Sequence, residues 1–454
     1  MGGFAVVGLV ACQAVPLHQP LAAPAALVPA FDLDPDPAVV EVSLSAEVGE
    51  ISVLGVNTEV WGYRDLGADE GLTVPGPLID VPVGARLRVH LENALPESTT
   101  IHFHGIRLPN DMDGTDHTQG LVRPGETYDY DFPTPEAGTY WYHPHFDTPN
   151  QVWRGLYGAV RVSDSGDMSA DRVFVLSDTT LDPDGRRLLE LPIEDRISGR
   201  QGSLLLVNGG STGGVLSVDG PERWRIVNAC TGRFFTLTLT GRPMVIEGTD
   251  AGAVQDPFEV TELRLAPGDR IELSVALGPG ETTSLLALPT DRAAEVPLGA
   301  TTVLWTAQAT STAGGQVGAP EPSLPLTKEP ADVAVREVVL SQGVAPNGDP
   351  LFSIDGAPWP FENPYAVNLG TTEIWDVQNQ TDYDQSFHLH GFFFRTLDIN
   401  GESIAHDTLE DTAEVPRRGS ARFLIEFDTP GAWMFHTHVL DQAELGMMSH
   451  IDVN

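Results

Sequence analysis

The stretch Gly431-Ala-Trp-Met-Phe-His-Thr-His-Val-Leu-Asp-Gln-Ala-Glu-Leu-Gly-Met-Met448 carries two histidines separated by one residue. Its aromatic residues and alternating character predict a buried β-strand at its start. Successive side chains of a strand point to opposite faces, so His436 and His438 are expected on the same side. Two neighbouring imidazoles fill a core poorly but make a good half of a metal site.

The same pattern of two histidines around one residue occurs three more times. These pairs are His102/His104, His143/His145 and His388/His390. Eight of the 13 histidines therefore lie in four identical pairs, which chance clustering explains poorly.

Internal repetition indicates the domain organisation. Three segments share a glycine turn, an alternating strand and a final asparagine: 84–93, 220–228 and 370–379. They begin 136 and then 150 residues apart, which is the size of a β-sandwich domain. A second repeat joins a turn at 122–125 to His143, and a turn at 415–419 to His436. The middle unit keeps a similar turn and strand at 266–273 without a histidine pair.

The sequence therefore predicts an all-β chain of three consecutive β-sandwich domains. Little of it has helical periodicity, and 46 Gly and 36 Pro suit a loop-rich β protein. The expected divisions are an N-terminal signal and Ala/Pro-rich tether at 1–37, domains at 38–165, 166–308 and 331–454, and a linker at 309–330. Only the first and last domains carry histidine pairs, so a shared site requires those two domains to touch.

The charge balance excludes one class of partner. The chain has 25 Lys and Arg against 64 Asp and Glu, a formal net charge of -39. Such acidity disfavours nucleic acid as a partner and is explained most simply by solubility.

The two cysteines are too few for a disulfide framework. Cys230 follows a strand-like run and is expected to be a small buried residue. Cys12 ends Leu9-Val-Ala-Cys12, which resembles a bacterial lipobox after an apolar run. We therefore expect export to the periplasm, the outer membrane or the cell exterior, with membrane attachment only through a lipid on Cys12. No basic residue precedes the apolar run, so either the start lies upstream or the segment is not a signal.

Eight convergent imidazoles favour copper, with zinc and iron less suited. A single zinc ion needs only three or four ligands, whereas eight histidines can hold two or three ions close together. The alternative is that each pair is a polar core satisfied by hydrogen bonds, which is costly for eight buried rings.

These motifs resemble the multicopper oxidase family, which includes laccases and bacterial copper-tolerance oxidases. The resemblance rests on the four pairs in this order and on the segments 73–79, 102–105, 140–145 and 388–391. It implies cupredoxin-like domains and a trinuclear cluster of about three copper ions that reduces dioxygen to water. It makes His102 and His388 the ligands of one copper, and it gives the coupled copper pair six ligands: His104, His143, His145, His390, His436 and His438.

The chain departs from the family at the blue (type 1) copper. The family's two histidines and one cysteine are replaced by Gln385, Gln442 and Thr437, and only the axial Met447 remains. Blue copper needs a soft thiolate and two imidazoles, so this site is expected to be empty. Electrons would then have to reach the cluster directly from an unknown small-molecule or protein donor, or the protein does not turn over.

Asp113 falls where family members keep an acid beside the cluster, and it is the one candidate catalytic residue. Its alternative reading is a solvated turn aspartate. The other family acid corresponds to Ala443, and Glu444 beside it is expected to point elsewhere.

Three functions fit these observations. The first is an exported copper-dependent oxidoreductase with a trinuclear cluster and no blue copper. The second is a non-catalytic copper-binding or scaffold protein on the same fold. A purely structural protein ranks third, because it should also have lost cluster histidines.

Overall fold

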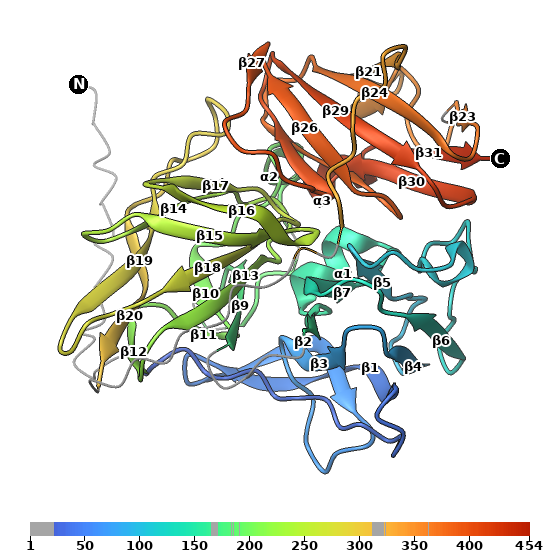
Figure 1. The fold of residues 1–454 in the computed structure, drawn as a ribbon. Helices are drawn as coiled ribbons and strands as arrows, with labels where there is room; N and C mark the ends of the chain where they lie inside the picture. The colour runs from blue at the N-terminus through green and yellow to red at the C-terminus, as the bar shows by residue number, and fades with distance from the viewer. Residues whose placement is uncertain are drawn as a thin grey trace, which may run out of the picture.

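The computed structural model describes residues 22–454 apart from 165–170, 183, 185, 190, 311–321, 323 and 362. Within this part, six β-sheets form three face-to-face pairs in chain order, as the sequence predicted (Figure 1). The Cys12 motif lies outside the described residues, as does much of the predicted linker. No helix in the described residues is long and apolar enough to cross a membrane.

The first sandwich is formed by residues between Val39 and Ser163. One sheet has the order β2 (Val56–Asp65), β1 (Val39–Val53), β4 (Arg86–Asn93) and β6 (Thr127–Pro133). The other has the order β3 (Gly76–Pro82), β8 (Gly158–Ser163), β7 (Gly138–His143) and β5 (His102–His104). The 3-10 turn η1 (Asn110–Met112) and the helix α1 (Thr148–Arg154) lie in its loops.

The second sandwich is formed by residues between Asp171 and Ala309. Its larger sheet has the order β11 (Gly210–Ser211), β10 (Leu204–Val207), β9 (Asp171–Thr179), β13 (Glu222–Asn228), β18 (Arg270–Val275), β15 (Met244–Thr249) and β16 (Gly252–Val260). Its smaller sheet has the order β12 (Gly214–Val218), β20 (Thr302–Ala309), β19 (Thr282–Leu288), β14 (Phe235–Leu239) and β17 (Leu263–Leu265). The helix α2 (Ile193–Ile197) lies in the loop after β9.

The third sandwich is formed by residues between Ala334 and Val453. One sheet has the order β22 (Pro350–Ile354), β21 (Ala334–Val344), β24 (Thr371–Asn379), β29 (Ser420–Phe427), β26 (Phe394–Ile399) and β27 (Glu402–Ser403). The other has the order β23 (Tyr365–Val367), β31 (Met448–Val453), β30 (Gly431–Thr437), β25 (Gln385–Leu389) and β28 (Thr412–Val415). The helix α3 (Leu440–Glu444) follows β30.

The internal repeat occupies the same position in each sandwich. Its strands are β4, β13 and β24, and each pairs in parallel with the first strand of its own sandwich. The glycines that begin the repeat, Gly84, Gly220 and Gly370, all have positive φ, which glycine adopts without steric cost. The sequence signal therefore reflects one structural unit used three times.

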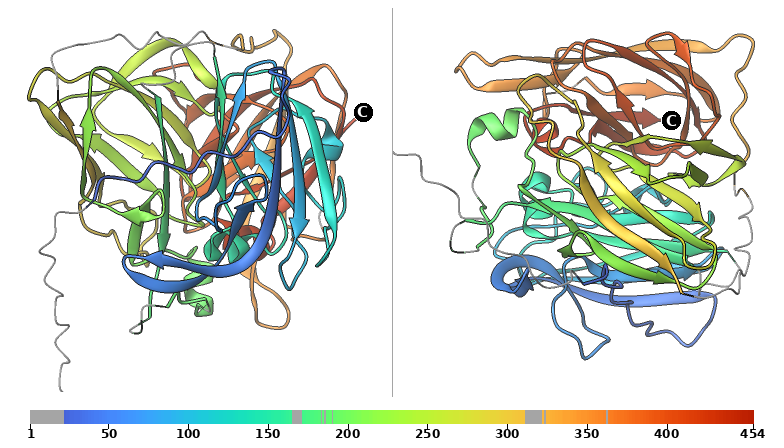
Figure 2. Two further views of the ribbon diagram at one scale, coloured as in Figure 1. Left: turned by 90° about the horizontal axis from the view of Figure 1, so that it is seen from below. Right: turned by 90° about the vertical axis from the view of Figure 1, so that its left-hand side faces the viewer.

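The first and third sandwiches share one continuous hydrophobic cluster, which includes Val42, Phe103, Phe387 and Phe435. The second sandwich has a separate core around Trp224 and Trp305, and Cys230 is buried within it, as predicted. The views in Figure 2 show the C-terminal sandwich packed against both others. The first and last histidine pairs therefore come from parts of the chain that touch.

Candidate metal centre

Two strand pairings place histidines of the same sandwich next to each other. His102 of β5 lies directly across from His143 of β7. His388 of β25 lies directly across from His436 of β30. His104 shares a face with His102 within β5, whereas His145, His390 and His438 follow the ends of β7, β25 and β30. Each outer sandwich therefore presents four imidazoles.

The two sets of four meet between the first and third sandwiches. His102 stacks on His390 with ring centroids 3.9 Å apart, and His104 stacks on His388 at 3.8 Å. All eight rings are buried, with residue exposures of 9% or less. The structure thus brings together every histidine that the sequence singled out.

Hydrogen bonds fix which ring nitrogen is free in six of these histidines. Carbonyl and carboxylate oxygens only accept, so the nitrogen facing one carries the proton and the other keeps its lone pair. Four Nδ1–H groups donate to backbone oxygens: His102 to Asp113, His143 to Pro144, His388 to Asp411 and His436 to Thr437. His390 Nδ1–H donates to the Asp113 carboxylate, and His104 donates from Nε2 to Asp411.

The free nitrogens converge on one another. The Nε2 atoms of His390 and His436 are 3.1 Å apart, and those of His145 and His436 are 3.3 Å apart. In His390 and His436 the proton is held at Nδ1, so the two facing Nε2 atoms present lone pairs. Two lone pairs at this distance repel, whereas a cation between them would be bound by both. The arrangement fits a metal ion held by these three rings.

The other rings also have buried nitrogens without a hydrogen-bond partner. Among the described residues, buried ring nitrogens without a hydrogen-bond partner are His102 Nε2, His388 Nε2, His104 Nδ1, His143 Nε2 and both nitrogens of His438. Buried polar atoms without a partner are costly unless another ligand satisfies them. The donor set, all imidazole, suits copper.

Burial also keeps these rings in the neutral form that binds metals. Desolvation lowers the pKa of His436 to about 3. For the same main cause the pKa values of five rings lie well below the ordinary value: His104, His143, His145, His390 and His438. Their neighbouring imidazoles add a smaller lowering effect.

Asp113 is not a solvated turn residue. It is 1% exposed, and its carboxylate lies 2.9 Å from His390 Nδ1 and 3.4 Å from His102 Nδ1. Although burial opposes ionisation, the two histidines lower the pKa of Asp113 below its usual range. Asp113 therefore orients one ring from the third sandwich and one from the first.

A second buried carboxylate, Asp411, escaped the sequence analysis. Its Oδ1 accepts from His104 Nε2 at 2.9 Å, and both carboxylate oxygens accept from the Arg270 guanidinium. Thr412 Oγ1 lies 3.0 Å from His104 Nε2 and 3.1 Å from His388 Nδ1. No motif marks Asp411 or Thr412, because their partners lie far away in the sequence.

The second sandwich carries no histidine pair, yet it contacts the site. A Cβ added to Gly268 would lie 3.0 Å from the His438 ring and 3.2 Å from His104 Cε1. Gly268 also has φ +94°, which favours glycine at this position. The neighbouring Pro267 carbonyl accepts from Ser386 Oγ at 2.6 Å. The turn that begins the repeat at 266–273 therefore contacts two rings of the histidine centre.

The residues at the blue-copper positions bond to one another. Thr437 Oγ1 donates to Gln385 Oε1 at 2.7 Å, and Gln385 Nε2 donates to Gln442 Oε1 at 2.7 Å. Gln442 Nε2 in turn donates to the Ile197 carbonyl. Met447 lies buried nearby in the chain. These polar groups satisfy each other's hydrogen bonds without a metal ion.

Among the described residues, the acidic side chains of α3 form no hydrogen bond with a cluster histidine. Asp441 is fully buried and accepts from Arg200 Nη2 at 2.5 Å and Nε at 2.7 Å. Ala443 packs against Met434 and Met448. Glu444 is exposed.

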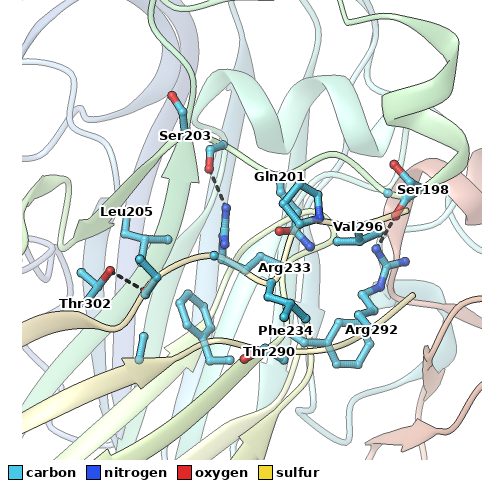
Figure 3. A pocket seen from close by; sticks show the side chains of 18 of the residues that line it. Ser198, Gln201, Ser203, Leu205, Arg233, Phe234, Thr290, Arg292, Val296 and Thr302 are labelled. Carbon is cyan, nitrogen blue, oxygen red and sulfur yellow. Dashed lines mark hydrogen bonds between the residues drawn. The ribbon is translucent and has the colours of Figure 1, made fainter. Parts of the chain in front are cut away.

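A cavity of about 510 Å³ lies beside this altered site (Figure 3). Its lining includes Ser198, Arg233, Phe234 and Arg292, and Arg292 donates to the Ser198 carbonyl. No hydrogen bond joins a described lining residue of this cavity to a cluster histidine.

Comparisons with known proteins agree with the fold. Two family models described as multicopper oxidase match residues 48–167 and 329–454, together more than half of the chain. Multicopper oxidase MmcO of Mycobacterium tuberculosis is 28% identical over 437 residues, covering 84% of this chain and 82% of that protein. Cell division protein FtsP of Shigella dysenteriae is 27% identical over 427 residues, covering 88% and 87%.

Among solved structures, the multicopper oxidase from Campylobacter jejuni, described as a metallo-oxidase, superposes with a TM-score of 0.83. It is 27% identical, and the match covers 96% of this chain and 98% of that one. The fold and the histidine centre thus define a protein of three cupredoxin-like domains. The chain belongs to the multicopper oxidase family, and membership implies a copper cofactor and dioxygen as electron acceptor.

Proposed function

We propose that this protein is an exported copper-dependent oxidoreductase with a trinuclear copper cluster and no blue copper. His102 and His388 would hold one ion. The six other paired histidines, His104, His143, His145, His390, His436 and His438, would hold a coupled pair. Copper ions bound there would supply the one-electron steps by which dioxygen is reduced to water.

The protein's own residues prepare this site. Asp113 and Asp411 hold the protons of His390 and His104 away from the centre, so that the opposite nitrogens face inward. Arg270 neutralises the buried charge of Asp411. The close packing of the surrounding strands excludes bulk water from the rings.

One observation carries the proposal. The lone pairs of His390 and His436 face each other at 3.1 Å, and five more rings have unpartnered nitrogens around them. Without cations this arrangement is costly for a fold to keep. The absence of a blue copper is supported by the hydrogen bonds among Gln385, Thr437 and Gln442.

Oxygen consumption by the copper-loaded protein tests this function. Ascorbate, hydroquinone and cuprous ion are suitable donors, and the last matches the metallo-oxidase description of the Campylobacter relative. We expect oxygen uptake that is lost in His388→Ala and unchanged in His117→Ala, a histidine outside the cluster. Uptake that persists in His388→Ala would show that the cluster is not its source.

The similarity to FtsP favours a second candidate. Relatives of that name are called cell division proteins, so a non-catalytic copper-binding or scaffold role on the same fold is the alternative. Copper retained by the wild-type protein without oxygen uptake from any of the three donors would support this role.

Export is part of the proposal and is tested separately. Labelled fatty acid should be incorporated into the wild-type protein and not into Cys12→Ser. Protein that stays in the cytoplasm without a lipid would contradict it.

A further inference from the structure

A second cavity, of about 450 Å³, opens between the second and third sandwiches. Its walls are rich in apolar side chains from both sandwiches. They include Phe258, Leu263, Ile271, Ile399 and Ile404. Near the opening, Phe258 stacks on His406 with centroids 3.9 Å apart and an interplanar angle of 8°. The volume lies in the range of pockets that hold small organic molecules.

The inner end of this cavity reaches the histidine centre. Thr412 lines the cavity, and its hydroxyl contacts His104 at 3.0 Å and His388 at 3.1 Å. Arg270 also lines the cavity and binds Asp411, which accepts from His104. A molecule in contact with Thr412 is therefore one side chain away from two cluster rings. The cavity beside Arg292 has no comparable link.

The charges of the lining indicate which kind of ligand the cavity can bind. Its two arginines are already paired, Arg264 with Glu414 and Asp384, and Arg270 with Asp411. Two further carboxyls, Asp269 and Glu410, have no arginine of their own in the described lining. This excess of acidic groups disfavours an anionic ligand.

The same two carboxyls do not favour a cationic ligand either. Burial raises the pKa of Glu410 to about 7 and that of Asp269 well above its usual range, so the cavity disfavours the charged form of both groups. Protonated or not, they accept hydrogen bonds from a hydroxyl group. Apolar walls and hydroxyl-binding groups at the inner end together suit a neutral aromatic alcohol.

We propose that this cavity binds the electron donor, a neutral phenol or hydroquinone, and that Thr412 and Asp411 connect it to the cluster rings. This inference rests on the proposed oxidoreductase function. It gives the protein an entry point for electrons that does not use the blue-copper position.

The reaction balances with the acceptor that the family uses. Each hydroquinone loses two electrons and two protons to become a quinone. Two hydroquinones therefore supply the four electrons and four protons that convert one dioxygen into two waters. The four hydroxyl protons end in the two water molecules, so no other acid or base is consumed.

Binding to the copper-free protein tests the site without relying on turnover. Para-fluorophenol is a suitable probe, followed by fluorine NMR. We expect saturable binding that is lost in Ala405→Trp, since Ala405 is an exposed residue of the cavity wall. The matched variant Ala300→Trp, in the wall of the cavity beside Arg292, should bind as the wild type does. Para-fluorobenzoate, which has the same ring with a negative charge, should bind at least about tenfold more weakly.

The link through Thr412 is tested in the copper-loaded protein. Thr412→Val keeps the shape and removes the hydroxyl, so we expect kcat for hydroquinone to fall about tenfold while KM stays unchanged. Thr412→Ser, which restores the hydroxyl, should recover the rate. The binding of para-fluorophenol to copper-free Thr412→Val should not change.

The outcomes separate this inference from the function on which it rests. Oxygen uptake that survives Ala405→Trp, or probe binding lost equally in Ala300→Trp, would overturn the inference and leave the oxidoreductase function standing. Probe binding at this cavity without oxygen uptake from any donor would instead contradict the function and the electron transfer inferred from it.

Discussion

At the scale of single residues, the site depends on where each imidazole keeps its proton. Sequence spacing identified all eight histidines, because the HxH pattern is local and each pair lies in a strand or at its end. It also indicated Asp113 through the family resemblance. It could not indicate which nitrogen of each ring would face the centre, since that depends on acceptors from distant loops.

Asp113→Ala is expected to weaken copper binding by about 10- to 100-fold, because His390 would lose the acceptor that holds its Nδ1–H. A chelator competition titration measures the change. Asp111→Ala is the matched control, since Asp111 is an exposed neighbour whose side chain lies outside the site. Equal affinity in both variants would remove Asp113 from the orienting role.

The triple variant Gln385→His, Thr437→Cys, Gln442→His is expected to gain an intense blue colour with copper. The three side chains already converge within hydrogen-bonding distance, and Met447 is retained. Two imidazoles and a thiolate at these positions make the ligand set of a blue copper. Visible absorption after copper loading measures the result. A colourless variant would show that the surrounding backbone no longer has the required geometry.

At the scale of strands and turns, the sequence predicted the outer sandwiches better than the connections between them. The repeated glycine-to-asparagine segments became β4, β13 and β24, each in an equivalent position. The turn at 266–269 was recognised as a repeat, but its contact with His438 was not predicted. That contact joins different sandwiches, and strand periodicity carries no information about such docking.

Arg270→Met is expected to destabilise the copper-free protein by about 3–5 kcal/mol, because it leaves the buried charge of Asp411 without its partner. Urea unfolding measures the loss. Arg242→Met is the control, since the pair between Arg242 and Glu281 lies at the surface, where solvent screens it, and its loss should change stability little. Similar losses in the two variants would mean that Asp411 is stabilised by other groups.

At the scale of the whole molecule, the first and third sandwiches each supply half of a site that neither completes alone. The second sandwich contacts this site from one side, where Arg270 binds Asp411 and Gly268 packs against His438. The need for the outer domains to touch was inferred from the distribution of the histidine pairs. The cavity between the second and third sandwiches had no sequence signal, because its walls come from several separate segments.

Copper-free protein is expected to lose stability as the pH falls below about 6.5, the ordinary pKa of histidine. Burial lowers the folded-state pKa of His436 to about 3 and those of most other cluster rings well below their usual value. Below pH 6.5 the unfolded chain therefore binds more protons than the folded one. The stability that the neutral rings contribute is present above this pH and is lost toward pH 3.

Thermal unfolding between pH 8 and pH 5 measures this dependence. We expect a falling midpoint below about pH 6.5 without copper, and a flatter profile with copper bound, because metal competes with protons for the same nitrogens. A copper-free midpoint that is constant over this range would contradict the neutral, closely packed state of the rings.

The central claim is a cluster of copper ions without a blue copper. Its most direct test is metal analysis combined with visible and electron paramagnetic resonance spectra of the protein loaded with excess copper and then freed of unbound metal. We predict about three copper ions per chain, no intense blue absorption and one normal cupric signal. Protein that retains no copper, or that shows the blue band, would contradict the account.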